Sequence, residues 1–142
     1  MKPNKIYLTA IALFLSIFVI ASSTAAQGNT AKAGLASSVW LAQVDSGEYG
    51  ESWNSAATHF KNTVKKEAWV QTLKSYRKPL GKTISRKIVS QKLTTELPAA
   101  PDGQYVLIDY ESSFENKKQT MERVTAMLEK DGSWKVAGYF FK

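Results

Sequence analysis

The chain has 142 residues, no cysteine, one histidine and a formal net charge of +7. The lack of cysteine excludes disulfides, thiolate metal ligands and cysteine nucleophiles, and a single histidine excludes a multi-histidine metal site. The length fits one domain behind a short leader. We therefore expect no cofactor and no metal, and a core that supports the fold by apolar packing alone.

The first segment, residues 1–26, has the three parts of a cleavable secretion signal. Lys2 and Lys5 supply the basic start, residues 8–21 form an uncharged apolar run, and small side chains precede the cleavage site. The run is shorter than the ~20 residues of a membrane-spanning helix, so an uncleaved anchor is the less favoured alternative. The pattern predicts a mature single domain of residues 27–142, periplasmic or secreted, with no stable membrane span after cleavage.

Three helices are predicted next, because apolar side chains recur there at spacings of three or four residues. They cover residues 30–44, 49–64 and 65–78. Pro79 ends the third helix, since proline disfavours a helical conformation in the residue before it. The first helix has an apolar stripe of Leu35, Val39 and Ala42, widened by Ala36, Trp40 and Val44.

After Gly81 the pattern changes to alternation of apolar and polar residues, which is typical of strands. The predicted strands cover residues 82–97, 104–115, 119–130 and 133–141. The first strand needs a β-bulge, because Val89 and Leu93 are out of phase with its earlier apolar residues. Asp131 and Gly132 predict a hairpin between the last two strands. The fold class is therefore α+β, with three N-terminal helices packed on one face of a curved, four-stranded antiparallel meander.

Several segments resemble a single bacterial family. They are Arg77–Gly81, Leu97–Gly103 and Trp134–Phe140, together with the spacing of Asp45, Tyr49, Ser52, Trp53 and Trp69. The family is domain of unknown function 4019 (DUF4019), whose members are small proteins with secretion signals. Ala99 stands where glycine is expected in the family's turn. The resemblance implies a fold and no activity. More distantly, the layout is similar to cystatin-like and nuclear-transport-factor-two-like folds, which sometimes enclose a small-ligand pocket.

No convincing catalytic set is present, so whether the protein is an enzyme stays open, with a non-enzyme favoured. Residues 81–83 lack the first glycine of a phosphate-binding loop, and Ser52 lacks the final glycine of a nucleophile elbow. Asp109 and Glu111 lie on one face of a predicted strand, about 7 Å apart. Such a pair is more often a solvated one, balanced here by neighbours such as Arg123.

A small-ligand pocket is the alternative hypothesis. If the helices and the sheet enclose a cone-like cavity, Asp109, Tyr110 and Glu111 are the candidate pocket residues. The protein would then be a pocket protein or an enzyme of cone-like α+β fold.

The most suggestive feature is a basic stretch over residues 61–92, which holds ten basic residues and one acid, Glu67. The candidate anion-binding patch consists of Lys74, Arg77, Lys78, Lys82, Arg86 and Lys87. Outside the cytoplasm its partner would be an anionic envelope component, a lipid headgroup or an acidic polymer, and not nucleic acid. The leading hypothesis is an exported, non-catalytic binding or accessory module, and the alternative is a solvated face that only favours solubility.

Overall fold

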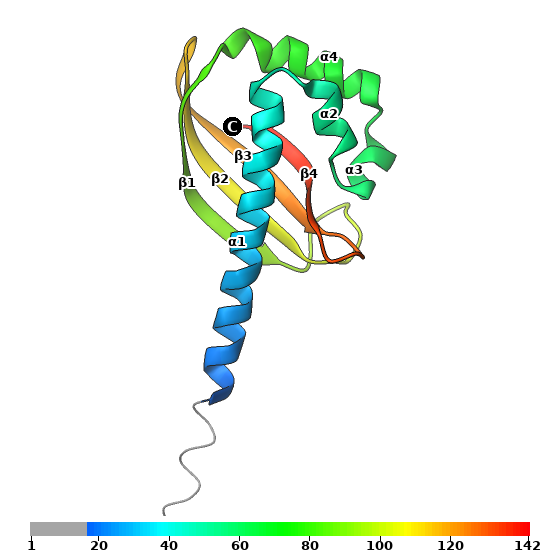
Figure 1. The fold of residues 1–142 in the computed structure, drawn as a ribbon, viewed down its shortest axis with the longest axis vertical. Coiled ribbons are helices and arrows are strands. Elements are labelled where there is room, and N and C mark those ends of the chain that lie inside the picture. Colours follow the sequence, from blue (N-terminus) through cyan, green and yellow to red (C-terminus); the bar gives the residue numbers. More distant parts are fainter. Residues whose placement is uncertain (1–16) are drawn as a thin grey trace, which may run out of the picture.

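The structure, a computed structural model, describes residues 17–142 (Figure 1). Helices come first: α1 (Ile17–Asp45), α2 (Tyr49–Asn54), α3 (Thr58–Thr63), α4 (Lys66–Tyr76) and the 3-10 helix η1 (Lys78–Leu80). The strands follow: β1 (Thr83–Thr94), β2 (Tyr105–Phe114), β3 (Lys117–Leu128) and β4 (Trp134–Phe141). Helices before the glycine at position 81 and strands after it are what the change in periodicity predicts.

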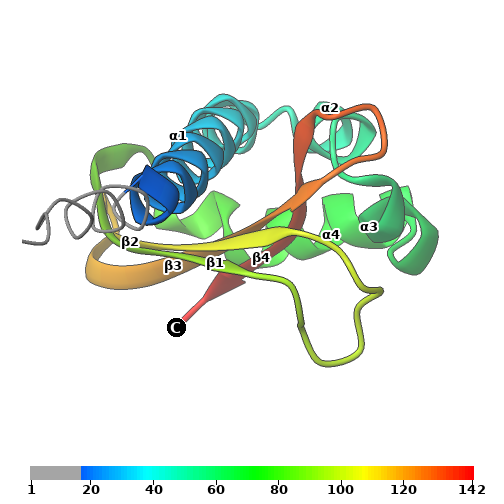
Figure 2. The same cartoon turned by 90° about the horizontal axis from the view of Figure 1, so that it is seen from below.

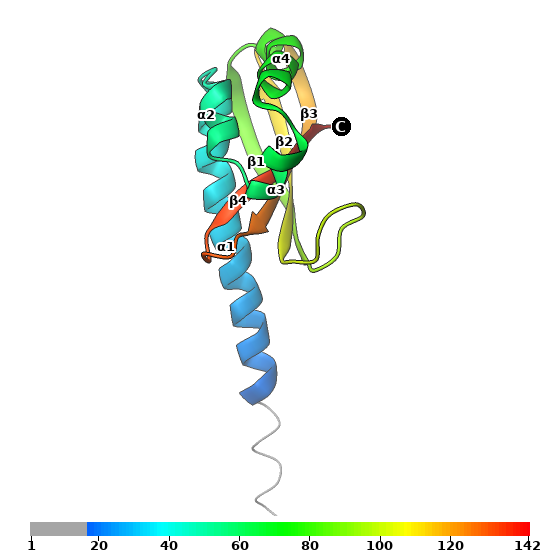
Figure 3. The same ribbon diagram turned by 90° about the vertical axis from the view of Figure 1, so that its right-hand side faces the viewer.

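The strands form one antiparallel sheet in the order β1-β2-β3-β4, so each strand pairs with its neighbour in sequence. Helix α1 crosses one face of this curved sheet. Helix α2 packs against α1, α3 contacts β4, and α4 lies across one end of the sheet (Figures 1 and 3). The predicted α+β class and the meander are therefore confirmed. The opposite face of the sheet carries no helix in the described part of the chain (Figure 2).

Most of the predicted secretion signal lies outside the described residues, which begin at position 17. Residues 17–26 form the first turns of α1, so the predicted cleavage site lies within a helix. Between residues 17 and 142, no helix combines the length and the apolar character needed to cross a membrane. Cleavage itself stays a prediction.

The predicted central stripe of α1, Leu35, Val39 and Ala42, is wrong, whereas Trp40 and Val44, which were predicted to widen it, are buried. Leu35 and Val39 are 69% and 61% exposed, and Ala42 is exposed as well. The face that packs on the sheet lies about half a turn away and consists of Ala33, Ser37, Trp40, Leu41 and Val44. Small residues there let the helix approach closely, since a Cβ on Gly34 would lie 3.0 Å from Gln91 Nε2. With this face inward, α1 buries the large apolar side chains of Trp40, Leu41 and Val44 against the sheet.

The second predicted helix, residues 49–64, is divided into α2 and α3. The break comes at Ala56 and Ala57, both fully buried. Ala57 is extended (φ −58°, ψ 149°), and its amide donates to the Val136 carbonyl of β4 at 2.8 Å. A main-chain hydrogen bond to the sheet thus interrupts the continuous helix that the aromatic spacing alone predicts.

Two β-bulges bend β1, at Ile84 and at Val89, where the pairing with β2 shifts by one residue. One bulge was expected from the phase of the apolar residues, and the bulge at Val89 accounts for it. The hairpin predicted at Asp131 and Gly132 joins β3 to β4, with Gly132 at φ 82°.

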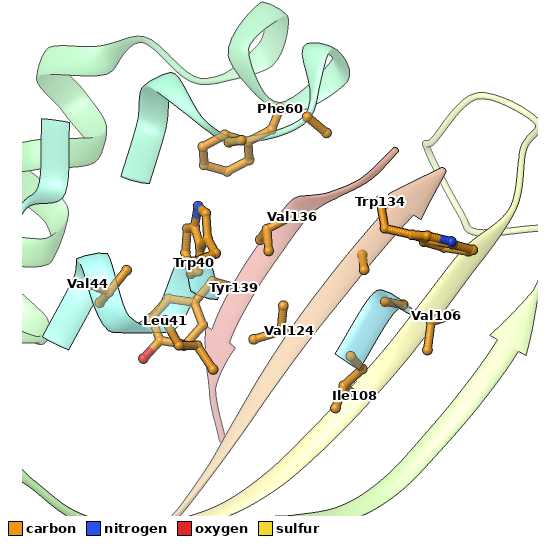
Figure 4. Packing of buried hydrophobic residues seen from close by; sticks show 14 of the residues in the cluster. Trp40, Leu41, Val44, Phe60, Val106, Ile108, Val124, Trp134, Val136 and Tyr139 are labelled. Atoms are coloured by element: carbon orange, nitrogen blue, oxygen red, sulfur yellow. The ribbon is translucent and has the colours of Figure 1, made fainter. Parts of the chain in front are cut away.

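The core lies between the helices and the concave face of the sheet (Figure 4). Trp40 is central to it: its ring centroid lies 5.5 Å from that of Tyr139 and 5.9 Å from that of Trp69. Ser52 joins the two tryptophans, because its carbonyl accepts from Trp40 Nε1 at 2.7 Å and its hydroxyl from Trp69 Nε1 at 3.0 Å. In the absence of disulfides, this aromatic packing stabilises the contact between the helices and the sheet.

Candidate anion-binding cleft

A cleft of about 390 Å³ opens where the end of α4 meets the start of β1. Its lysines, Lys74, Lys78 and Lys82, are exposed. Lys74 and Lys78 are four residues apart across the end of α4, so both project to the same side of the chain. No salt bridge within 4.0 Å involves these lysines in the described residues, which leaves their charges available to a ligand.

The turn that places Lys82 in the cleft depends on Gly81. Gly81 has φ 77°, a left-handed conformation that glycine adopts without steric cost. A Cβ there would also lie 2.6 Å from Glu115 Oε2 and 3.0 Å from Glu115 Cβ, so the Glu115 side chain would have to move from its present position. The same Glu115 oxygen accepts from the Lys82 amide at 2.7 Å, and Asn116 Nδ2 donates to the Pro79 carbonyl at 2.9 Å. The turn between β2 and β3 thus holds this corner of the cleft.

Arg77 forms the base of the cleft and is 2% exposed. Its Nη1 donates to the Gly81 carbonyl at 2.7 Å and its Nη2 to Asp45 Oδ1 at 3.0 Å. The guanidinium also stacks over Phe114, 4.4 Å from the ring centroid. Thr83 completes the corner, since its hydroxyl donates to Asp45 at 2.9 Å. Arg77 is therefore a structural cation that ties α4, α1 and β1 together, rather than a surface charge.

A second buried arginine continues this network into the core. Arg86 Nη1 donates to Asp45 Oδ2 at 2.6 Å, and its Nε donates to Glu122 Oε2 at 2.6 Å. Glu122 is fully buried and also accepts hydrogen bonds from the hydroxyls of Ser112 and Tyr139. Because Arg86 Nη2 donates to Oε1 as well, each carboxylate oxygen of Glu122 has two donors, as a buried charge requires.

The charges of this network shift the pKa values of its members. Burial alone would raise the pKa of Asp45, but the hydrogen bonds and charge of Arg86, with Arg77, hold it below its usual range. For Tyr139, burial and the charge of Glu122 both act in the same direction and raise the pKa well above that of free tyrosine. Both groups therefore keep one protonation state near neutral pH.

Within the described residues, the charged groups of the cleft that have no ion pair are its three lysines. Among residues 17–142, no three side chains of His, Cys, Asp or Glu gather as a metal site. The cleft's acids are already engaged, Asp45 by the two arginines and Glu115 by the Lys82 amide. What remains accessible is a set of three ammonium groups, which can hold an anion by charge and hydrogen bonding.

Comparison with known families gives one match. The model described as "Protein of unknown function (DUF4019)" matches residues 36–139, most of the chain. This protein belongs to the DUF4019 family. No curated protein and no solved structure matches it. The distant likeness of this DUF4019 protein to cystatin-like and nuclear-transport-factor-two-like folds therefore stays a prediction.

The residues whose spacing marks the DUF4019 family have structural roles here. Asp45 joins the arginine network, and Ser52 links Trp40 to Trp69. Trp53 Nε1 donates to the Val64 carbonyl at 2.7 Å, which fixes the segment that connects α3 to α4. The family pattern in this chain is thus largely a packing pattern, and it points to no reaction.

The structure separates the three predicted pocket residues. Tyr110 faces the helices, is 3% exposed, and lines a hollow of about 430 Å³ beside α1 together with Arg86. Asp109 and Glu111 lie on the opposite face of the sheet, because neighbouring strand residues alternate between faces. Asp109 is paired there with Arg123, 2.7 Å from Nε to Oδ1. The three side chains do not share one cavity.

The predicted anion-binding patch is divided as well. Lys74, Arg77, Lys78 and Lys82 line the cleft. Arg86 lies inside the domain, with its side chain 13% exposed and both flanking carboxylates bound to it. Lys87 pairs in register with Glu111 and so lies on the face without helices.

Sequence reasoning missed Glu122 and the part that Asp45 plays. The signal for Glu122 was present, because Glu122 has the same strand parity as the core residues Val124 and Ala126. A carboxylate in phase with a buried run predicts a cation close by in the sheet, and Arg86, on β1 two strands from β3, is that cation.

Proposed function

We propose that this DUF4019 protein is exported and acts in the cell envelope as a non-catalytic binding module for an anionic component. The ligand group is a phosphate or carboxylate, carried by a lipid headgroup or an acidic polymer. The cleft lined by Lys74, Lys78 and Lys82 is the proposed binding site. This proposal depends on one observation: the three lysines line the same cleft, and none of them forms an ion pair among the described residues.

The charge of the cleft supports this proposal. Its lining includes three lysines and Arg77 against two carboxylates, Asp45 and Glu115, and both carboxylates already accept hydrogen bonds from the protein. At an anionic surface each lysine contributes roughly 1 kcal/mol to binding, and salt weakens the contribution. The expected binding is therefore reversible and strongly dependent on ionic strength.

The packing of α1 supports export by a cleaved signal. Among the residues of α1 whose burial is described, 23–45, the first buried one is Ala33, and the side chain of Asn29 donates to Gln104 at 3.2 Å. A cut after Ala26 would leave the packing face of α1 from Ala33 onward on the mature chain. Loss of residues 1–26 also removes Lys2 and Lys5 and no acid, which leaves a net charge of +5 on the mature chain.

The test compares two triple variants of equal charge. Lys74, Lys78 and Lys82 are changed to Gln in one, and Lys87, Lys92 and Lys130, exposed and outside the cleft lining, in the other. Binding to phosphatidylglycerol vesicles and to soluble polyphosphate is measured over a range of salt. We expect the cleft variant to bind more than about tenfold more weakly, from roughly 1 kcal/mol for each lysine, and the control to retain most of its affinity.

The two probes separate the two sources of the anion. Binding to vesicles alone assigns a lipid headgroup, and binding to polyphosphate alone assigns a soluble polymer. Equal loss in both triple variants would show that only net charge matters, and wild-type protein that binds neither probe at low salt would remove the proposal.

A further inference from the structure

Another hollow, lined by the face of the sheet without helices and by His59 of α3, shares no lining residue with the lysine cleft. Residues 95–104, between β1 and β2, leave the sheet on that side (Figures 2 and 3). The hollow between this segment and the sheet has a volume of about 460 Å³, within the range of about 300–1,000 Å³ for small-molecule sites. Tyr105 holds the segment in place, because its hydroxyl donates to the Pro101 carbonyl at 2.5 Å.

The walls of the hollow are mainly apolar. They include Leu97, Pro98 and Ala100 from the segment, and Leu107, Gly138 and Phe140 from the strands. The strand pairing places Leu107, Thr125 and Gly138 in one row on this face. Phe140 is 59% exposed, which is unusual for a phenylalanine beside an apolar hollow and marks a surface suited to an apolar ligand.

Gly138 makes the floor of the hollow deep. A Cβ at this position would lie 3.2 Å from Phe140 Cε2 and 3.5 Å from Thr125 Cβ. The backbone of Gly138 is not in the left-handed region, so the turn chemistry of glycine does not explain its presence in the middle of β4. Its effect is to leave space on the sheet surface where any other residue would fill the hollow.

The rim of the hollow is cationic. Arg123 and Lys142 both line it, and no Asp or Glu side chain does. Asp109 lies beside them and binds Arg123 through Nε and Nη2, both at 2.7 Å, which leaves Arg123 Nη1 without a protein acceptor in the described chain. Lys142 is 48% exposed and lies 3.6 Å from the same carboxylate. Two cations thus share one acid, and a pair of N–H donors is free.

We propose that this hollow binds a single-chain anionic amphiphile, with the chain on the floor at Gly138 and Phe140 and the acid group at Arg123 and Lys142. The apolar walls account for the chain, and the free guanidinium edge accounts for a carboxylate, phosphate or sulfate head. The site shares no residue with the lysine cleft, so it is independent of the proposed function.

The test uses sodium dodecanoate below its micelle concentration, with binding measured by calorimetry and by the amide signal of Gly138 in heteronuclear NMR. We expect one saturable site and a shift of the Gly138 signal. Gly138→Val fills the floor with a residue that strands favour, and we expect it to weaken binding at least about tenfold while the domain stays folded. A second variant, Phe140→Ala, removes an exposed floor side chain near the end of β4, and we expect a smaller loss of affinity from it.

The charged part of the proposal is tested with dodecanol and with Arg123→Met. Dodecanol should bind the wild-type protein at least several-fold more weakly than dodecanoate does. Dodecanoate should bind the Arg123→Met variant at least several-fold more weakly than it binds the wild-type protein. The matched control is the triple lysine variant of the cleft, which should bind dodecanoate with unchanged affinity. The proposal is overturned if dodecanoate binds only above its micelle concentration, if dodecanol binds equally well, or if neither Gly138→Val nor Phe140→Ala weakens binding.

Discussion

The two faces of the sheet each hold an arginine–carboxylate pair, and the two pairs differ mainly in their surroundings. On the helix-covered face, Glu122 is fully buried and the side chain of Arg86 is 13% exposed. On the face without helices, the side chains of Asp109 and Arg123 are 15% and 31% exposed. The pair of Arg123 and Asp109 joins the neighbouring strands β3 and β2, with a closest N–O distance of 2.7 Å. The pair of Arg86 and Glu122 joins β1 and β3, which are separated by β2, with a closest N–O distance of 2.6 Å.

The difference shows how burial decides what the same chemistry does. Both carboxylate oxygens of Glu122 have fixed donors in Arg86, Ser112 and Tyr139, so this ion pair is part of the core. Around Asp109 one edge of Arg123 is left free beside an apolar hollow. The two sites that we propose, the hollow and the lysine cleft, are therefore both places where cations are incompletely paired.

The largest expected effect comes from breaking the buried pair. Arg86→Met leaves Glu122 without a cation inside the core, and removing one partner of a buried pair costs about 3–5 kcal/mol of unfolding free energy. Arg123→Met on the other face is the matched control, with an expected cost of about 1 kcal/mol or less. Urea denaturation of both variants measures the difference. Similar losses for the two would contradict the distinction between the faces.

The alternation of apolar and polar residues predicted the sheet, but it did not predict the contacts on either of its faces. Alternation was sufficient to predict these strands, because Val106 and Ile108 in β2, and Val124 in β3, belong to runs in which every second residue is apolar and buried. It did not identify the ion pair, since Arg86 and Glu122 are 36 residues apart and only the strand register brings them together. The hollow at Gly138 was equally hidden, because it depends on where residues 95–104 fold back.

The helical layer shows a second limit of sequence reasoning. Leu35 and Val39 form a stripe as regular as the buried one, and periodicity alone does not say which stripe faces the sheet. Trp40 decides the matter through its contacts with Tyr139 and Trp69, which come from β4 and α4. Such a choice rests on tertiary packing, which local spacing does not contain.

A smaller effect is expected at Asp45, the carboxylate at the boundary between the network and the cleft. Its pKa is lower in the folded state than in the unfolded chain, so the stability it contributes is present above about pH 4 and is lost as the pH falls through the folded value. Asp45→Asn should cost about 1–3 kcal/mol at pH 7 and flatten the loss of stability on acidification.

The comparison variant for this titration is Asp109→Asn. The pKa of Asp109 is also lowered, chiefly by its hydrogen bond to Arg123, so this variant should flatten the same acid limb. The effect should be smaller, because the cations beside Asp109, Arg123 and Lys142, are more exposed to solvent than the two arginines beside Asp45. Thermal unfolding at a series of pH values from 2 to 7 measures both. An acid limb unchanged in Asp45→Asn would show that other carboxylates dominate it.

The smallest expected effect concerns Ala99, on the segment that covers the hollow. Ala99 has φ 60°, a left-handed conformation that costs a residue with a Cβ about 1–2 kcal/mol, and glycine is the residue expected there in the family's turn. Ala99→Gly removes this strain but adds roughly 0.5–1 kcal/mol of backbone entropy to the unfolded chain, so the net gain in stability should be about 0.5 kcal/mol. The segment forms one wall of the hollow, so the same variant also tests the hollow. We expect a small gain in melting temperature together with a changed affinity for dodecanoate, because the wall is altered and the core is not. A loss of stability would show that the conformation of Ala99 is not strained.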